Sequence, residues 1–157
     1  MYLRYVVMNI RPCMKAITKL ILIILLGSAI MTAGSCKEDP YDEIPDVYVD
    51  MWLDISSTMY IELTAVGGWV NVTGGYKGIT VYRASMDEFV AFERCCTYDP
   101  HTDSARVVVD VSGLSLTCGS CGSTFLILDG SIVNGPAKIP LKQYRTFFNG
   151  DDLRIYN

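Results

Sequence analysis

Residues 118–141 read CGSCGSTFLILDGSIVNGPAKIPL, and this stretch decides the fold class. It contains two short runs rich in β-branched and aromatic residues, Phe125 to Leu128 and Ser131 to Val133, with Asp129-Gly130 between them. An Asp-Gly pair between two such runs is typical of a tight hairpin, because glycine supplies the positive φ angle that the turn needs. The stretch therefore predicts antiparallel strands joined by short turns.

The same rhythm of short apolar runs and glycine or asparagine turns continues on both sides of this stretch. No apolar stripe at helical spacing follows residue 36, although Ser85 to Glu88 could form a single turn. The expected strands are 51–55, 59–64, 69–72, 78–83, 89–93, 106–111, 114–117, 125–128, 131–133, 143–147 and 153–156. We therefore predict an all-β domain built as a small antiparallel barrel or a pair of antiparallel sheets.

The first 35 residues have the composition of a targeting segment. Four basic residues and no acidic ones accompany a seven-residue aliphatic run, Leu20 to Leu26, and mostly small residues follow it up to Ser35. This order predicts a secretory signal peptide. The apolar stretch is shorter than the ~20 residues needed to cross a bilayer, which disfavours a permanent transmembrane helix. Met14 begins a conventional signal peptide by itself and is the alternative start of the chain.

Ala33-Gly-Ser-Cys36 resembles the lipobox of bacterial lipoproteins. The resemblance implies that Cys36 becomes the first residue of the processed chain and carries a lipid anchor, which is stable because several acyl chains are attached. Lys37-Glu-Asp39 resembles the signal that sends lipoproteins of the Bacteroidetes to the outer face of the outer membrane. We expect an exported protein anchored in the outer membrane, with cell-surface display as a further hypothesis. An ordinary secretory signal and a solvated linker are the alternatives.

The expected organisation is a signal peptide at residues 1–35, a lipidated acidic linker at 36–50 and a β domain at 51–157. The processed chain keeps nine basic and all 17 acidic residues, a net charge of −8. This charge argues against nucleic acid as a partner, because phosphates require a basic surface. No nucleophile elbow, phosphate loop or metalloprotease motif is present. An electron-transfer or binding module is therefore favoured over a stand-alone enzyme.

Two cysteine-containing segments resemble the cluster-binding loops of the Rieske superfamily. The first is TVYRASMDEFVAFERCCT at residues 80–97, and the second is CGSCGSTF at residues 118–125, followed by Gly135-Pro-Ala137 and Pro140-Leu141. The resemblance extends from about Gly68 to the C terminus. It implies a small antiparallel β domain in which two loops at one tip hold a metal centre and the proline-containing segment packs against them.

The ligand positions differ from the family's pattern. A Rieske cluster has two cysteines on one iron and two histidines on the other, and this chain contains one histidine. Tyr98 stands where the first loop's histidine is expected, and Cys121 stands where the second loop's is expected. An ordinary two-histidine centre is therefore excluded. His101 cannot replace both nitrogens and is interpreted as an exposed loop residue, with Tyr98 and His101 as accessory donors at most.

Three states of Cys95, Cys96, Cys118 and Cys121 stay open. The first is a [2Fe–2S] cluster with all-thiolate or mixed ligation, which would pass single electrons to an unknown partner protein. The second is a zinc ion with four sulfur ligands. The third is a metal-free domain whose loops are joined by disulfides, as an oxidising compartment favours, and which acts in binding or as a structural module. Because adjacent strand residues point to opposite faces, Cys95 needs a local bulge to join Cys96.

Overall fold

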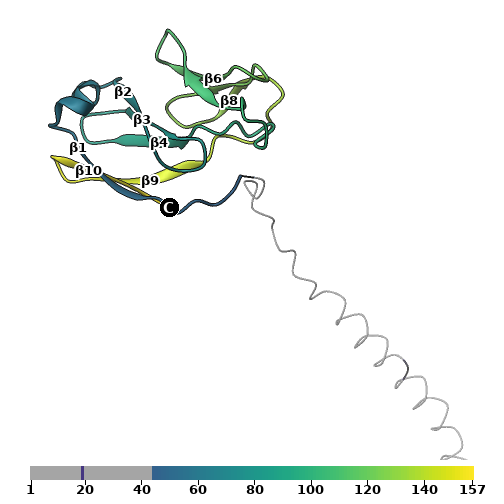
Figure 1. The fold of residues 1–157 in the computed structure, drawn as a ribbon, viewed down its shortest axis with the longest axis horizontal. Helices are drawn as coiled ribbons and strands as arrows, with labels where there is room; N and C mark the ends of the chain where they lie inside the picture. The colour runs from purple at the N-terminus through teal and green to yellow at the C-terminus, as the bar shows by residue number, and fades with distance from the viewer. Residues whose placement is uncertain (1–18, 20–43) are drawn as a thin grey trace, which may run out of the picture. The chain divides into compact units, whose positions relative to one another are not determined.

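The structure is a computed structural model that describes Lys19 and residues 44–157. The predicted signal peptide apart from Lys19, the lipid attachment at Cys36 and the first part of the linker lie outside the described residues. Residues 44–157 contain ten strands and one short 3-10 helix, and Figure 1 shows their arrangement. In chain order they are β1 (Asp50–Asp54), η1 (Thr58–Thr64), β2 (Trp69–Val72), β3 (Ile79–Arg83), β4 (Phe89–Glu93), β5 (Val107–Val109), β6 (Ser115–Cys118), β7 (Thr124–Leu126), β8 (Ile132–Asn134), β9 (Gln143–Phe148) and β10 (Asp152–Tyr156).

The strands form two antiparallel sheets. The larger has the order β1-β10-β9-β4-β3-β2, and the smaller has the order β5-β6-β7-β8. The smaller sheet is inserted in the chain between β4 and β9, which are neighbours in the larger sheet (Figure 1). The chain therefore leaves the larger sheet at Glu93, builds the smaller sheet, and returns at Gln143. The predicted all-β antiparallel fold class is confirmed.

Strands β3 and β4 lie at the centre of the core, because every residue in both is buried. Their side chains alternate between two hydrophobic clusters. One cluster contains Phe92 and is shared with the cysteine loops and the smaller sheet, and the other contains Val81 and is shared with β1 and β10. Burial of each large apolar side chain contributes about 1.5–3 kcal/mol. Core side chains therefore pack on both faces of β4, which ends two residues before the Cys95-Cys96 pair.

The prediction of a strand at residues 59–64 is wrong, because this segment is the 3-10 helix η1. The Ser57 side chain accepts a hydrogen bond from the Met59 N–H and caps the start of the helix. At the other end the Arg83 guanidinium donates to the carbonyl oxygens of Leu63 and Thr64. Of the helix residues only Leu63 is buried. The short apolar run that predicted a strand here therefore forms a helix, which is capped by Ser57 and held by Arg83.

The packed part of the chain begins upstream of Met51. Ile44 and Val49 are buried, and the Val49 N–H donates to Asn157 Oδ1 at 3.0 Å. Packing therefore reaches into the segment that the sequence analysis assigned to the linker. Within the part of the chain that the structure describes, no helix has the length and hydrophobicity needed to span a membrane.

Candidate metal centre

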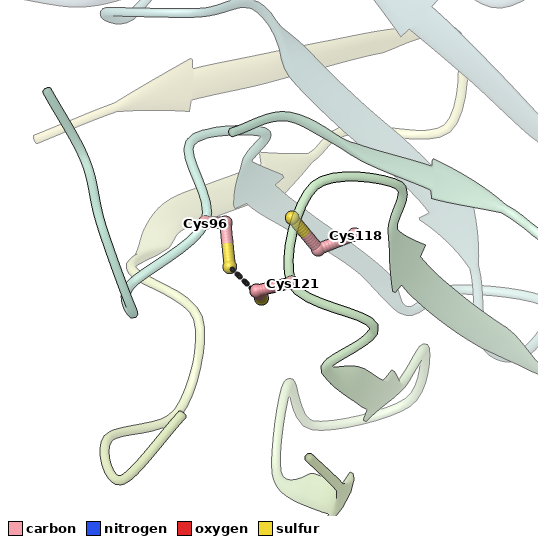
Figure 2. Close-up of side chains that lie close together, drawn as sticks. All are labelled: Cys96, Cys118 and Cys121. Atoms are coloured by element: carbon pink, nitrogen blue, oxygen red, sulfur yellow. Dashed lines mark hydrogen bonds between the residues drawn. The ribbon is translucent and has the colours of Figure 1, made fainter. Parts of the chain in front are cut away.

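Three cysteines from two loops meet at one end of the smaller sheet. The sulfur atoms of Cys96, Cys118 and Cys121 all lie within 4.8 Å of one another. Cys96 Sγ and Cys121 Sγ are 3.6 Å apart, although 25 positions separate the two residues in the chain (Figure 2). Cys96 and Cys118 are fully buried, whereas Cys121 is partly exposed. The structure thus brings together three of the four thiols that the sequence singled out.

Cys95 lies outside this group. Its fully buried thiol points toward the carbonyl oxygens of Pro100 (3.6 Å) and Cys96 (3.8 Å). Burial raises the pKa of the Cys95 thiol to about 11. The backbone of Cys95 pairs with Arg106 in an isolated antiparallel bridge. The two adjacent thiols therefore point in different directions, as strand geometry dictates.

Tyr98 and His101 occupy different surroundings. Tyr98 is 54% exposed and lines a cavity of about 260 Å³ beside the thiols, together with Asp99 and Ser120. Cys96, Cys121, Ala105 and Pro136 complete the lining. His101 is exposed and is not among the residues that line the cavity. The structure places Tyr98, but not His101, next to the group of thiols.

Glu93 anchors the first cysteine loop from beneath, and the sequence analysis did not single it out. Its fully buried carboxylate accepts hydrogen bonds from the backbone N–H groups of Tyr76 (2.7 Å), Lys77 (2.8 Å) and Cys95 (3.1 Å), and from the Tyr144 hydroxyl (2.7 Å). Burial, and then the bond to Glu93, raise the pKa of Tyr144. The available signal was an acidic residue at the end of the apolar strand FVAFE. A buried carboxylate with four donors is a structural anchor.

Lys77 supports the far side of the same loop. Its side chain is almost fully buried, and its Nζ donates to the carbonyl oxygens of Thr102 (2.5 Å) and Ala105 (3.4 Å). The Cys96 N–H donates to Ala105 O at 3.0 Å, so the cysteine is tied to the segment that Lys77 holds. The position of Cys96 thus depends on residues distant in the sequence.

The second cysteine loop is a tight local turn. The Cys118 N–H donates to Ser123 O (2.8 Å), and the Gly122 N–H donates to Cys118 O (2.9 Å). Gly122 has a φ of 76°, in the left-handed region that favours glycine. The Ser123 hydroxyl accepts from the Cys121 thiol and from the Ala137 N–H, both at 3.1 Å. The loop is therefore closed by its own backbone and tied to the Gly135-Pro-Ala137 segment.

The surroundings shift the pKa values of the Cys96 and Cys121 thiols in opposite directions. Burial raises the pKa of Cys96. Burial also acts to raise the pKa of Cys121, but hydrogen bonds with Ser123, Cys96 and Cys118 outweigh it and leave this pKa below its ordinary value. The partly exposed Cys121 thiol is therefore deprotonated more readily than the Cys96 thiol.

Thiolates are the ligands that soft metal ions and iron–sulfur clusters prefer, so the group has the chemistry of a metal site. A [2Fe–2S] cluster takes four protein ligands, as does a structural zinc ion. The described residues supply three thiols, and the fourth cysteine points toward backbone carbonyls. The predicted set of four thiolates is therefore not assembled. All four described cysteines are free thiols.

No protein-family description and no curated protein matches this chain. Several solved structures resemble it in fold. The Nocardioides aromaticivorans IC177 ferredoxin of carbazole 1,9a-dioxygenase is 14% identical, with 59% of this chain and 86% of that chain covered and a TM-score of 0.42. The Sphingomonas yanoikuyae B1 ferredoxin is 19% identical, with 61% and 93% covered and a TM-score of 0.42.

A chain from the complex of reduced oxygenase and oxidized ferredoxin in carbazole 1,9a-dioxygenase is 21% identical, with 67% of this chain and 92% of that chain covered and a TM-score of 0.47. Each of these is a likeness of fold between chains that share less than 25% sequence identity. At identities below 25% and TM-scores below 0.5, they assign no residue and no function.

Proposed function

We propose that this protein is an exported, membrane-tethered module that holds a metal centre through Cys96, Cys118 and Cys121 and uses it to pass single electrons to a partner protein. The observation that carries the proposal is the meeting of these three sulfur atoms within 4.8 Å of one another. Two separately supported loops converge on the same point, and soft metal ions are the natural occupant of such a group of thiols.

The placement of the thiols suits exchange with a partner. Cys96 and Cys118 are buried, but Cys121 is partly exposed and borders the cavity with Tyr98. A partner can therefore approach the centre from the side of Cys121. Because the processed chain carries a net charge of −8, we expect a partner with a basic docking surface, which would speed encounter at low salt.

Tethering is proposed from the sequence before residue 40. Cys36 is the proposed lipid attachment site, and Lys37-Glu-Asp39 supports export to the outer membrane with display on the cell surface. Metabolic labelling with a radioactive fatty acid should mark the wild type and leave Cys36→Ser unlabelled. Protease added to intact cells should then digest the wild-type protein. Digestion only after the outer membrane is broken would contradict surface display.

The test of the metal centre is elemental and sulfide analysis, with visible and electron paramagnetic resonance spectra, on processed protein purified without oxygen and without metal-chelating resin. We expect bound metal in the wild type and its loss in Cys118→Ser. Gly119→Ala is the matched control, because a methyl group there meets no atom within 4 Å and the loop keeps all its thiols. A folded, metal-free protein with four reactive thiols would contradict the proposal.

A second candidate function is a metal-free binding module closed by one disulfide. The observation that favours it is the 3.6 Å separation of Cys96 Sγ and Cys121 Sγ, together with the proposed export to an oxidising compartment. A bridge there would join the two loops and add about 2–4 kcal/mol to the stability. Thiol counting under denaturing conditions separates the candidates, since the bridged domain has two free thiols, Cys95 and Cys118, and loses stability on reduction.

A further inference from the structure

We propose that Cys96, Cys118 and Cys121 bind one thiophilic metal ion as three protein ligands and leave its fourth coordination position open to the cavity beside Tyr98. The inference rests on the proposed metal centre and deepens it, because it specifies how many ions the site takes and where an external ligand enters. Its geometry differs from that of a two-iron cluster, which requires four protein ligands.

The distances between the three sulfur atoms indicate how many metal ions the site holds. Ligands at ~2.3 Å from one ion in tetrahedral geometry lie about 3.8 Å from each other. Cys96 Sγ and Cys121 Sγ are 3.6 Å apart, and no two of the three sulfur atoms are farther apart than 4.8 Å (Figure 2). Ligands on two different irons would be separated further, by the pair of irons between them. The three thiols are therefore spaced as ligands of a single ion.

Two further donors at the first loop, the Cys95 thiol and the Glu93 carboxylate, are engaged in other contacts. The Cys95 thiol faces the carbonyl oxygens of Pro100 and Cys96, on the other side of the first loop. The Glu93 carboxylate accepts four hydrogen bonds, one of them from the Cys95 N–H. Recruiting Cys95 would therefore require the loop to leave its anchor. The ion is left with three thiolates from this part of the chain.

The cavity supplies the fourth position. Its volume of about 260 Å³ exceeds the ~30 Å³ that one water molecule occupies in the liquid, and two of the three ligands, Cys96 and Cys121, form part of its wall. Metal sites with three protein ligands and an adjoining opening bind an exchangeable ligand, whereas sites with four protein ligands are closed. The site is therefore built to accept a donor from solution.

The charge of the site determines which class of external ligand can occupy the open coordination position. Three thiolates on a divalent ion leave a net negative charge, and the exposed Asp99 lines the same cavity. An anion would be repelled, and a neutral donor would not. We therefore assign the open position to water or to a neutral nitrogen ligand, and we choose imidazole as the probe and azide as its anionic counterpart.

The experiment uses the processed full chain in detergent, first as purified for metal and acid-labile sulfide content, then freed of metal and titrated with Co²⁺ under reducing conditions. We expect one metal per chain without sulfide, saturation at one Co²⁺, and a visible spectrum that shifts saturably with imidazole and at least tenfold less readily with azide. Cys118→Ser should weaken Co²⁺ binding by at least about 100-fold, beyond the 10–100-fold typical of residues that only support a ligand. Cys95→Ser should change it by less than threefold, and Cys95→Ala provides a second variant if the serine hydroxyl disturbs folding.

The outcomes separate this inference from the proposed function. Two irons and two sulfides per chain would overturn the single ion and keep the metal centre. One ion whose spectrum ignores imidazole would overturn the open position. A Cys95→Ser variant that folds but binds no Co²⁺ would overturn the three-ligand set. A wild-type protein that binds no metal at all, with Cys96 and Cys121 in a disulfide, would overturn the proposed function itself.

Discussion

The two cysteine loops meet at the same place but are held there by different kinds of interaction. The first loop, residues 94–106, is held by two buried charged side chains: Glu93 at the end of β4, and Lys77 in the turn between β2 and β3. The second, residues 118–123, is held by two hydrogen bonds of its own backbone and a glycine with positive φ. One loop depends on a buried polar network, and the other on a local turn. We therefore expect substitutions under the first loop to cost more than substitutions within the second.

The largest expected effect is that of Glu93→Ala. The substitution leaves three backbone N–H groups and the Tyr144 hydroxyl without their acceptor in a fully buried place. Because each buried unsatisfied donor costs about 1–3 kcal/mol, we expect a loss of at least about 3 kcal/mol in the free energy of unfolding, measured by urea denaturation. Glu88→Ala, at an exposed position, is the control and should stay within about 0.5 kcal/mol. An equal loss of unfolding free energy in both variants would show that the hydrogen bonds to Glu93 do not hold the first loop.

The next effect is expected at Gly135, which packs the proline-containing segment on the second loop. A Cβ at this residue would lie 2.5 Å from Ser123 Cα, and its φ is 106°. We expect Gly135→Ala to cost about 2–3 kcal/mol, from backbone strain and overpacking together. Gly150→Ala shares the positive φ, 110°, but its Cβ meets nothing within 4 Å. The difference between the melting curves of the two variants measures the cost of the contact between the new Cβ and Ser123. Identical curves would show that residue 135 does not pack closely on Ser123.

The same contrast explains what the sequence could predict. The place and packing of the second loop were expected from the resemblance of CGSCGS and the following Gly-Pro-Ala to a known loop, and such a resemblance can be read because the loop is one short stretch of sequence. The strands were predicted because their turns and β-branched runs are also local signals; β2 and β4 were predicted to the residue. Two features depend on distant partners and were missed. Arg83 holds Met59 to Thr64 as a helix, and Glu93 supports the cysteine loop. The acidic residue that ends FVAFE was a signal for Glu93, but the spacing of residues does not identify its distant partners Tyr76 and Tyr144.

Lys77→Met tests whether the hydrogen bonds from Lys77 hold the first loop closed. Methionine keeps the apolar stem of the buried side chain and removes the donors to Thr102 O and Ala105 O. We expect a loss of about 1–2 kcal/mol, since both carbonyls lose a charged partner while Ala105 O keeps the Cys96 N–H as a donor. Thiol labelling of the native protein should also reach Cys95 faster. Lys138→Met, at an exposed position, is the control, and unchanged labelling of Cys95 would argue that Lys77 does not hold the loop closed.

Gly122→Ala tests the local turn of the second loop. Its φ is 76°, but a Cβ there meets no atom within 4 Å, so only backbone strain opposes the substitution. We expect a cost of about 1 kcal/mol, smaller than for the variants above. Gly119→Ala lies in the same loop, without positive φ and with open space around it, and should be neutral or slightly stabilising. A loss in Gly119→Ala as large as that in Gly122→Ala would show that the left-handed backbone is not what defines this turn.

The smallest expected effect is a pH dependence at Asp110, in the turn between β5, which follows the first loop, and β6, which leads into the second. Its carboxylate accepts hydrogen bonds from the side chains of Ser112 (2.6 Å) and Ser115 (2.7 Å), and these lower its pKa to about 2. Because the folded pKa lies below the unfolded value, the stabilisation is present above about pH 4 and is lost as the pH falls toward 2. Urea unfolding of wild type and Asp110→Asn should therefore differ modestly at pH 5 and converge near pH 2. Asp110 is only partly buried, so the difference should be slight and should leave the reactivity of Cys121 unchanged. A change in that reactivity would mean that the hairpin couples the two loops, and that they are not positioned independently.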